Sequence, residues 1–335
     1  MDMEVSMAIL VPGGAGYIGS HTVYELIEAG RDVVVIDNLQ TGYRDSVHPM
    51  AKFYQADIRD EDALDNIFRN ESIEAVIHFA ASIQVAESMS DPLKYYDNNL
   101  YGTMVLLRSM LKNGVNTIVF SSSAATYGET GEVPIKEDSP ANPESCYGET
   151  KLAMERLMHW CAGAYGLKYA ALRYFNACGA HPSGAIGESH VPETHLIPLI
   201  LQVANGQRPH ISIYGDDYDT PDGTCIRDYI HVTDLAQAHI LAVDYLLGGG
   251  KNDVFNLGNG VGFSVKEVID CARKVTGHEI PEVIAPRRPG DPARLVASSD
   301  KAVRTLNWKP KYDDLEMIIS TAWNWHRSNP NGFAR

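Results

Sequence analysis

A glycine-rich turn directly after a short apolar run is the feature that most constrains how this chain folds. Residues 8–11 are apolar enough for a buried strand, and Gly13, Gly16 and Gly19 follow where a helix begins. Glycine permits a tight turn, brings backbone close to a ligand and lets helix and strand pack together. The free N–H groups at the helix start favour a pyrophosphate. The pattern therefore predicts a dinucleotide-binding βα unit.

Apolar runs alternate with helical patterns through the first half of the chain. Strands are expected at residues 33–36, 75–79, 117–120 and 169–172, and a helix is expected at 91–114, with Asp91 as N-cap before Pro92. This alternation predicts an α/β fold, a Rossmann-type doubly wound parallel sheet covered on both faces by helices.

The pattern loosens after about residue 176. We expect residues 1–176 to form the dinucleotide-binding domain, with a later crossing back near 229–246. Residues 177–335 would mainly form a smaller C-terminal α/β domain that binds the substrate.

An acidic residue closes the second expected strand. Asp37 lies where a carboxylate accepts hydrogen bonds from the adenosine ribose and repels a 2′-phosphate, which favours NAD over NADP. The alternative is an aspartate that only caps a turn. Asp57 and Ile58 follow a third short strand and are candidates to flank the adenine.

A phenol and an ammonium lie four residues apart, on one face of a helix. Tyr147 and Lys151 follow the strand that ends at Ser123. A nearby lysine and a positive nicotinamide ring favour the phenolate, which then accepts a proton from a sugar hydroxyl. Because ligands bind at the carboxyl ends of parallel strands, we predict that these three residues form a catalytic set. The alternative is a surface helix pair held by packing.

Composition narrows the partners. The 43 acidic and 28 basic residues give a net charge of −15, which argues against nucleic-acid binding. No stretch is apolar for long enough to cross a membrane. The cysteines show no CxxC pair and no zinc-ligand spacing, so we expect reduced thiols in a cytoplasmic protein without a metal site: Cys146, Cys161, Cys178, Cys225 and Cys271.

Taken together, these motifs resemble those of the UDP-glucose 4-epimerases, extended short-chain dehydrogenases/reductases, over essentially the whole chain. The matching segments include GGAGYIG at 13–19, FSSSAATYG at 120–128, YGETK at 147–151, RYFNACGAHP at 173–182, DGTCIRDYIHVTDLA at 222–236 and APRRPGDPARL at 285–295.

The resemblance implies a site for NAD and a site for a UDP-hexose. The residues implied to contact NAD are Gly13, Gly16, Tyr17, Ile18, Gly19, Asp37, Asn38, Leu39, Asp57, Ile58, Phe79, Ala80, Ala81, Asn98, Ser123, Tyr147, Lys151 and Phe175. Those implied to bind the UDP-sugar are Ser123, Tyr147, Asn176, His195, Leu196, Ser212, Ile213, Tyr214, Arg227, Arg288, Asp291 and Leu295.

The implied reaction inverts the 4-hydroxyl of the hexose through a 4-keto sugar, with NAD tightly bound and regenerated in each turnover. The smaller domain would bind the UDP-sugar, and galactose metabolism is the implied context. The resemblance also suggests a homodimer built from the helices at 93–111 and 147–165, whose apolar faces are otherwise core.

Three positions depart from the usual pattern of these enzymes. Pro12 replaces a threonine and removes one backbone donor, with a small expected effect. Ile83 stands where some epimerases carry a lysine directed at the cofactor. Leu295 falls where a tyrosine restricts the pocket to plain hexoses, so this intermediate side chain predicts partial acceptance of UDP-N-acetylglucosamine.

Three other functions remain open from the sequence. A nucleotide-sugar 4,6-dehydratase or decarboxylase uses the same scaffold, but dehydratases carry Asp and Glu after the strand-end hydroxyl, where this chain has Ala124 and Ala125. A non-catalytic NAD sensor has no need of Ser123, Tyr147 and Lys151. An ordinary alcohol dehydrogenase would hold its cofactor loosely.

Overall fold

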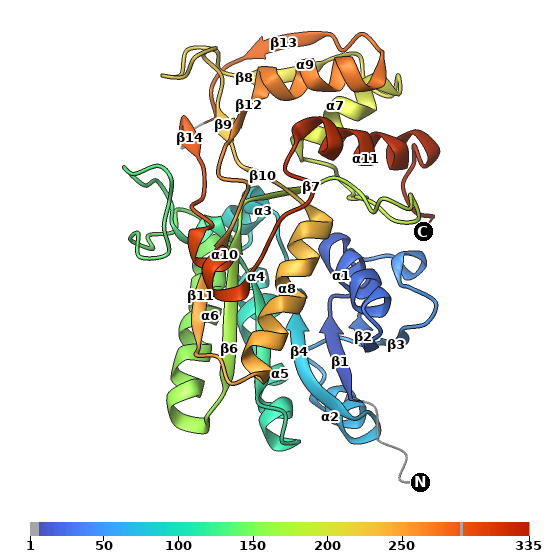
Figure 1. Ribbon diagram of the computed structural model, residues 1–335, viewed down its shortest axis with the longest axis vertical. Coiled ribbons are helices and arrows are strands. Elements are labelled where there is room, and N and C mark those ends of the chain that lie inside the picture. The colour runs from blue at the N-terminus through green and yellow to red at the C-terminus, as the bar shows by residue number, and fades with distance from the viewer. Residues whose placement is uncertain (1–6, 289–290, 335) are drawn as a thin grey trace.

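A seven-stranded parallel sheet forms the larger part of the protein, a computed structural model that describes residues 7–288 and 291–334 (Figure 1). The strand order is β11-β6-β5-β4-β1-β2-β3, so the order reverses beside β1, as the predicted doubly wound Rossmann-type sheet requires. The strands are β1 (Ala8–Pro12), β2 (Asp32–Asp37), β3 (Lys52–Gln55), β4 (Ile73–His78), β5 (Thr117–Ser123), β6 (Lys168–Tyr174) and β11 (Asp253–Leu257).

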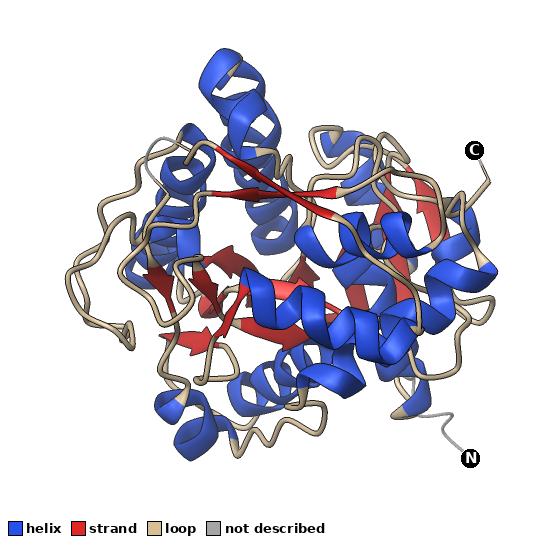
Figure 2. Cartoon of the chain, turned by 90° about the horizontal axis from the view of Figure 1, so that it is seen from above, coloured by secondary structure: helices blue, strands red, loops and turns tan. Residues whose placement is uncertain are grey.

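Helices cover both faces of this sheet, which Figure 2 shows from above. One face packs against α1 (Tyr17–Glu28), α8 (Val232–Leu247) and α10 (Asp300–Leu306). The other packs against α2 (Glu61–Asn70), α5 (Gly102–Lys112) and α6 (Cys146–Tyr165). Successive side chains of β1 enter opposite cores, Ile9 the first and Leu10 the second, because strand side chains alternate between the two faces.

A smaller α/β part lies beyond the carboxyl ends of the strands (Figure 1). Its core is enclosed by α7 (Leu196–Ala204), α9 (Val265–Thr276) and α11 (Leu315–Ser328), with the parallel pair β8 (Ile211–Tyr214) and β13 (Glu282–Ala285). Two small sheets accompany it: β7 (Asn176–Cys178) with β10 (Tyr229–His231), and β9 (Ile226–Arg227) between β12 (Phe263–Ser264) and β14 (Arg294–Leu295).

The chain passes between the two parts more than once. From β10 it returns along α8, which lies beside α1, and adds β11 to the edge of the sheet. Later, Trp308 packs into the same core. Within the described ranges, no helix is both long and apolar enough to span a membrane.

The helix expected at 91–114 is interrupted. Asp91 caps α4 (Pro92–Tyr95) as predicted, after α3 (Val85–Ser90), but a π-helical turn at Tyr96–Tyr101 then separates α4 from α5. The wider turn rotates α4 relative to the buried face of α5. The face of α4 that points inward therefore carries Tyr95, which is fully buried, whereas Leu93 is 80% exposed. The first part of the expected apolar face therefore points outward.

Candidate active site

The glycine turn after β1 leaves a bare stretch of backbone at the start of α1. Gly13 has a φ of +82°, and a Cβ atom there would lie 2.5 Å from the backbone nitrogen of Ala80. A Cβ on Gly19 would lie 2.2 Å from the carbonyl oxygen of Gly13. The N-cap, Gly16, offers no side-chain acceptor, so the first N–H groups of α1 remain for a ligand. The geometry fits a pyrophosphate.

Asp37 anchors the same turn. Its carboxylate accepts hydrogen bonds from the backbone N–H of Ala15, at 3.0 Å, and of Leu39, at 2.8 Å. Burial raises the pKa of this carboxyl group. Asp37 therefore stabilises the turn, which was the alternative interpretation from the sequence. Each of its carboxylate oxygens also keeps a lone pair for a ribose hydroxyl.

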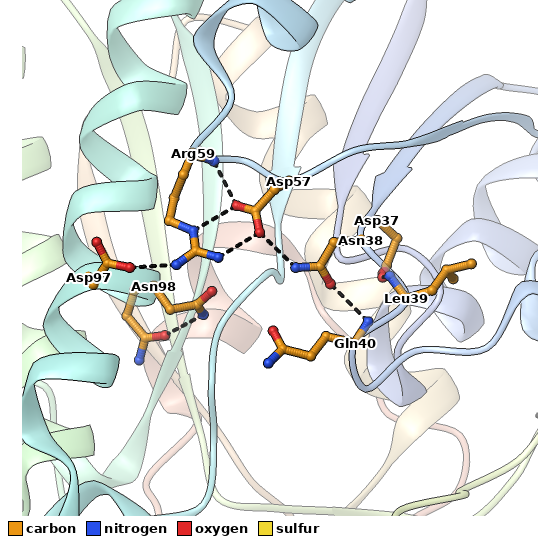
Figure 3. A network of polar contacts seen from close by, with 9 residues as sticks. Asp37, Asn38, Leu39, Gln40, Asp57, Arg59, Asp97 and Asn98 are labelled. Carbon is orange, nitrogen blue, oxygen red and sulfur yellow. Dashed lines mark hydrogen bonds and ion pairs between the residues drawn. The ribbon is translucent and has the colours of Figure 1, made fainter.

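The loops after β2 and β3 are joined by a polar network (Figure 3). Asn38 donates to Asp57 at 2.9 Å, and Arg59 donates to both carboxylate oxygens of Asp57, at 2.9 and 2.8 Å. The paired Arg59 holds the pKa of Asp57 well below its usual range. Arg59, which the sequence analysis missed, also pairs with Asp97 on the π-helical turn. This network fixes the rim of the expected adenosine site.

The loop after β4 is held by the π-helical turn. Asn99 is fully buried; its side chain accepts from the backbone N–H of Ser82 at 2.7 Å and donates to Thr150 of α6 at 3.1 Å. Asn98 donates to Asn99 at 3.1 Å. Phe79 and Ala80, before Ala81, donate to the carbonyl oxygen at the end of β1, at 2.9 and 3.0 Å. Asn99 was not singled out from the sequence, because only the π-helical turn places it here.

Ser123 and Tyr147 come together at the carboxyl edge of the sheet. Ser123 ends β5, and Tyr147 lies in the first turn of α6, where Ser145 caps the helix by accepting from Gly148 at 3.1 Å. Burial raises the pKa of the Tyr147 phenol, and its hydrogen bond with Ser123 offsets part of that rise. In this environment Tyr147 is protonated unless a positive charge is placed beside it.

Lys151 lies one turn further along α6. Its Nζ donates to the carbonyl oxygen of Ser121 at 2.8 Å and lies 5.8 Å from the centre of the Tyr147 ring. Burial lowers the pKa of Lys151 to about 7. Ser123, Tyr147 and Lys151 therefore form one cluster, with an ammonium that loses its proton readily near neutral pH.

The lowered pKa of Lys151 predicts a pH dependence of stability. An unfolded lysine titrates near pH ~10.4. Between about pH 7 and that value the unfolded chain binds more protons at this residue than the folded chain, so folding becomes more favourable as pH rises. Urea unfolding of the wild type and of Lys151→Met from pH 7 to 10 should show the wild type gaining stability relative to the variant. A constant difference would contradict the assignment.

A buried ion pair lies behind Lys151. Arg173 of β6 donates to Glu155 of α6 at 2.9 and 2.6 Å, and Ser122 donates to the same carboxylate at 2.5 Å. The guanidinium lies 4.7 Å from the ring centre of Tyr127. The sequence analysis did not identify this pair, although the spacing of Lys151 and Glu155 on one helix face was a usable signal.

The residues predicted for the sugar side lie on the short strands of the smaller part. Asn176 donates to the carbonyl oxygen of Asp228 at 2.8 Å. Arg227 pairs with Asp291 and lies opposite Leu295 in the parallel pair of β9 and β14. Leu295 packs against a buried cluster that contains Phe175, which links the two predicted sites.

The predicted residues of β8 and the adjoining loop form a second group. The Arg288 guanidinium lies 4.0 Å from the ring centre of Tyr214. Ser212 is partly buried, whereas Ile213 is 1% exposed and packs into the core of the smaller part. Only the main chain of Ile213 is therefore available to contact a ligand.

His195 and Leu196 lie at the start of α7, beside charged residues that the sequence analysis did not single out. His195 Nδ1 lies 2.9 Å from a carboxylate oxygen of Glu188 and 2.9 Å from one of Glu193. Tyr17 reaches this region from α1, donating to the carbonyl oxygen of Gly179 at 2.7 Å. The turn after β1 is thus tied to the smaller part.

Comparison with known proteins identifies the family. Residues 9–258 match the NAD dependent epimerase/dehydratase family. A UDP-glucose 4-epimerase of Lacticaseibacillus casei is 60% identical over 327 residues, covering 98% of this chain and 99% of that protein. The chain belongs to the UDP-glucose 4-epimerase family.

Solved structures of UDP-glucose 4-epimerases share the fold throughout. One crystal structure is 57% identical with a TM-score of 0.97, covering 98% of this chain and 100% of that chain. The enzyme from Bifidobacterium longum in complex with NAD+ and UDP is 42% identical with a TM-score of 0.92, covering 98% and 100%. The epimerase fold therefore includes both parts of this chain.

Proposed function

We propose that this protein is an isomerase that interconverts UDP-galactose and UDP-glucose by inverting C4 of the hexose. The observation that carries the proposal is the cluster of Ser123, Tyr147 and Lys151 at the carboxyl edge of the sheet. Identity of 60% to a UDP-glucose 4-epimerase over nearly the whole chain supports the substrate class. The reaction belongs to galactose metabolism.

NAD is the cofactor. The close approaches at Gly13 and Gly19 leave no room for side chains, and the uncapped start of α1 suits a pyrophosphate. Asp37 and the network of Asn38 and Asp57 would hold the adenosine. Bound NAD would supply reversible hydride transfer at C4, with return of the hydride to the opposite face, so the reaction would have no net oxidation.

Tyr147 transfers the proton. Its phenolate accepts the proton of the 4-hydroxyl and returns it after the configuration of C4 has been inverted. Ser123, hydrogen-bonded to Tyr147, donates to the same sugar oxygen, and Lys151 supplies positive charge behind the phenol. Because burial alone raises the pKa of Tyr147, the phenolate depends on positive charge at the site.

The smaller part binds the nucleotide. We assign the diphosphate to Arg227 and Arg288, whose guanidinium groups make strong bonds to phosphate oxygens. Asp291, paired with Arg227, orients that group. We assign NAD binding to residues 1–176, together with the segment near 229–246 that returns to the sheet. We assign UDP-sugar binding mainly to residues 177–335.

A 4,6-dehydratase is the closest alternative. It eliminates water from the 4-keto sugar and needs an acid and a base next to the oxidised carbon. Ser123 is followed by a 3₁₀ turn at Ala124–Thr126, which carries no carboxyl group. The 4-keto sugar is therefore reduced again without elimination.

The size of Leu295 predicts which UDP-sugars the enzyme accepts. It is partly buried and packs near Phe175, so its size sets the space beside the sugar. We expect slow but measurable epimerisation of UDP-N-acetylglucosamine and UDP-N-acetylgalactosamine, and we expect Leu295→Tyr to lose this turnover while it retains UDP-galactose turnover. Product chromatography at high enzyme concentration measures both. The prediction fails if the wild type leaves the N-acetylated sugars unchanged.

A homodimer is the proposed assembly. Leu93 of α4 and Trp160 of α6 are 80% and 74% exposed, and these two helices contact each other. Large exposed apolar side chains on neighbouring helices favour association with a second copy. Sedimentation equilibrium should give twice the chain mass, and Leu93→Asp should shift it toward the monomer; a monomeric wild type would exclude the dimer.

The cytoplasm is the proposed location. All five cysteines are free thiols, as expected in a reducing compartment. Cell fractionation tests the location, and recovery of the protein outside the cytoplasm would exclude it.

Incubation of the purified protein with UDP-galactose, without added NAD, tests the function. Conversion to a mixture with UDP-glucose, without release of NADH, is the expected result. A requirement for stoichiometric free NAD would indicate an alcohol dehydrogenase. No conversion by folded protein after addition of NAD would exclude the proposed substrate.

A further inference from the structure

Four side chains between β7 and α7 lie close enough to share one metal ion. Glu188, His190, Glu193 and His195 each offer one nitrogen or oxygen atom, and these atoms lie within 4.8 Å of one another. His195 Nδ1 is 2.9 Å from an oxygen of each carboxylate. His190 Nδ1 is 3.1 Å from Glu188 and 3.6 Å from Glu193. Two imidazoles therefore face two carboxylates in one small volume.

These separations lie close to the edges of a tetrahedral zinc site. Zinc binds histidine nitrogen at about 2.0–2.1 Å and carboxylate oxygen at about 2.0–2.2 Å, so neighbouring ligand atoms lie about 3.3–3.5 Å apart. Three nitrogen–oxygen separations, from 2.9 to 3.1 Å, are shorter than this value, and the 3.6 Å separation is to the other oxygen of Glu193. The ion would therefore spread these groups slightly from their present hydrogen-bonding distances.

His190 faces both carboxylates from inside the fold. Its Nδ1 atom is buried, 3.1 Å from Glu188 and 3.6 Å from Glu193. A protonated ring pairs with these carboxylates, whereas a deprotonated Nδ1 atom is a metal ligand, so zinc binding releases a proton.

We propose that Glu188, His190, Glu193 and His195 bind one Zn²⁺ ion at a structural site that goes beyond the epimerase reaction. Two carboxylates and two neutral imidazoles balance the charge of the ion. Four protein ligands complete the tetrahedron and leave no open position for a substrate, so the ion orders the chain and takes no part in the chemistry.

The position of the cluster gives the ion a role in holding the two parts of the chain together. The ring of Tyr17, at the start of α1, meets the His190 ring edge-on, with 6.0 Å between ring centres. Trp325 of α11 donates to the carbonyl oxygen of Glu188 at 3.2 Å. His195 precedes α7 directly. The ion therefore fixes the beginning of α7 between α1 and α11.

This proposal departs from the prediction of no metal site, which rested on the spacing of the cysteines. A second group, Glu25, Glu28 and His181, also brings three potential ligand atoms together. Glu28 is exposed there, and His181 Nε2 lies 3.6 and 3.7 Å from the two carboxylates, farther than three of the four contacts in the first cluster. The second group therefore supplies a matched control.

Zinc content and ligand geometry test the proposal. Protein without a histidine tag is equilibrated with zinc chloride, freed of unbound ion by gel filtration and analysed for bound zinc and by X-ray absorption. The expected result is one zinc ion per chain, with nitrogen and oxygen ligands at about 2.0–2.1 Å and no sulfur. His190→Gln should weaken zinc binding by more than the roughly 10–100-fold loss that follows removal of a supporting second-shell partner, whereas His181→Gln should bind as the wild type does.

Three outcomes overturn the proposal: no zinc retained by the wild type, a sulfur ligand in the absorption spectrum, or loss of zinc from His181→Gln alone. Circular dichroism checks the folding of His190→Gln. If that variant does not fold, the X-ray absorption spectrum of the wild type alone tests the zinc site. Neither readout depends on turnover. Zinc binding without UDP-galactose conversion would therefore count against the proposed function alone.

Discussion

Replacing Tyr147 by phenylalanine lowers kcat by roughly 10²–10⁴-fold, the usual contribution of general acid–base catalysis. The ring and its buried packing remain, but no group is left to exchange a proton with the 4-hydroxyl. Bound NAD should stay at the wild-type level, because the glycine turn and Asp37 are untouched. Initial rates with UDP-galactose and NAD content after denaturation measure the two effects.

Tyr165 provides the matched control for this substitution. It ends the same helix, α6, and is 66% exposed. Tyr165→Phe should therefore keep the wild-type kcat. If Tyr147→Phe retained more than a tenth of the wild-type kcat, another group would have to carry the proton.

Replacing Glu155 by leucine should lower the free energy of unfolding by about 3–5 kcal/mol, because it leaves the charge of Arg173 buried and unpaired. Both side chains are at most 7% exposed, so water cannot take the place of the carboxylate. Removing both charges, in Glu155→Leu with Arg173→Met, should cost less than the single substitution. Urea unfolding followed by circular dichroism measures the difference.

A surface pair gives the comparison for this prediction. Asp270 pairs with Arg273 at 2.8 Å, and its side chain is 70% exposed. Asp270→Asn should change stability by less than about 1 kcal/mol, because exposed pairs are screened by solvent. Equal losses for Glu155→Leu and Asp270→Asn would show that burial does not control the effect.

Local sequence was sufficient for the cofactor half of the molecule. The five strands whose ranges the sequence predicted, β1, β2, β4, β5 and β6, contain short apolar runs. The glycine turn needs Gly13 and Gly19 because any Cβ atom would strike nearby backbone. Tyr147 and Lys151 share a helix face through their spacing alone. Such features depend on a few neighbouring residues, so they can be read directly from the chain.

The smaller part was harder to predict, because its strands contain two to four residues and pair with distant segments. Arg227 meets Asp291 and Leu295 only because β9 and β14 lie side by side, across a long stretch of sequence. The resemblance to the epimerases predicted these positions, whereas composition and periodicity did not predict them.

The sequence by itself determined the parallel sheet, the glycine turn and the spacing of Tyr147 and Lys151, because these follow from backbone sterics and helical or strand periodicity. Only the tertiary structure decided which charges from distant segments meet: Glu155 with Arg173, Arg59 with Asp97, and Arg227 with Asp291. It also decided the phase shift at the π-helical turn, which turns Leu93 outward and buries Asn99. The pairing of these groups depends on how distant segments pack, and no local pattern in the chain encodes that packing.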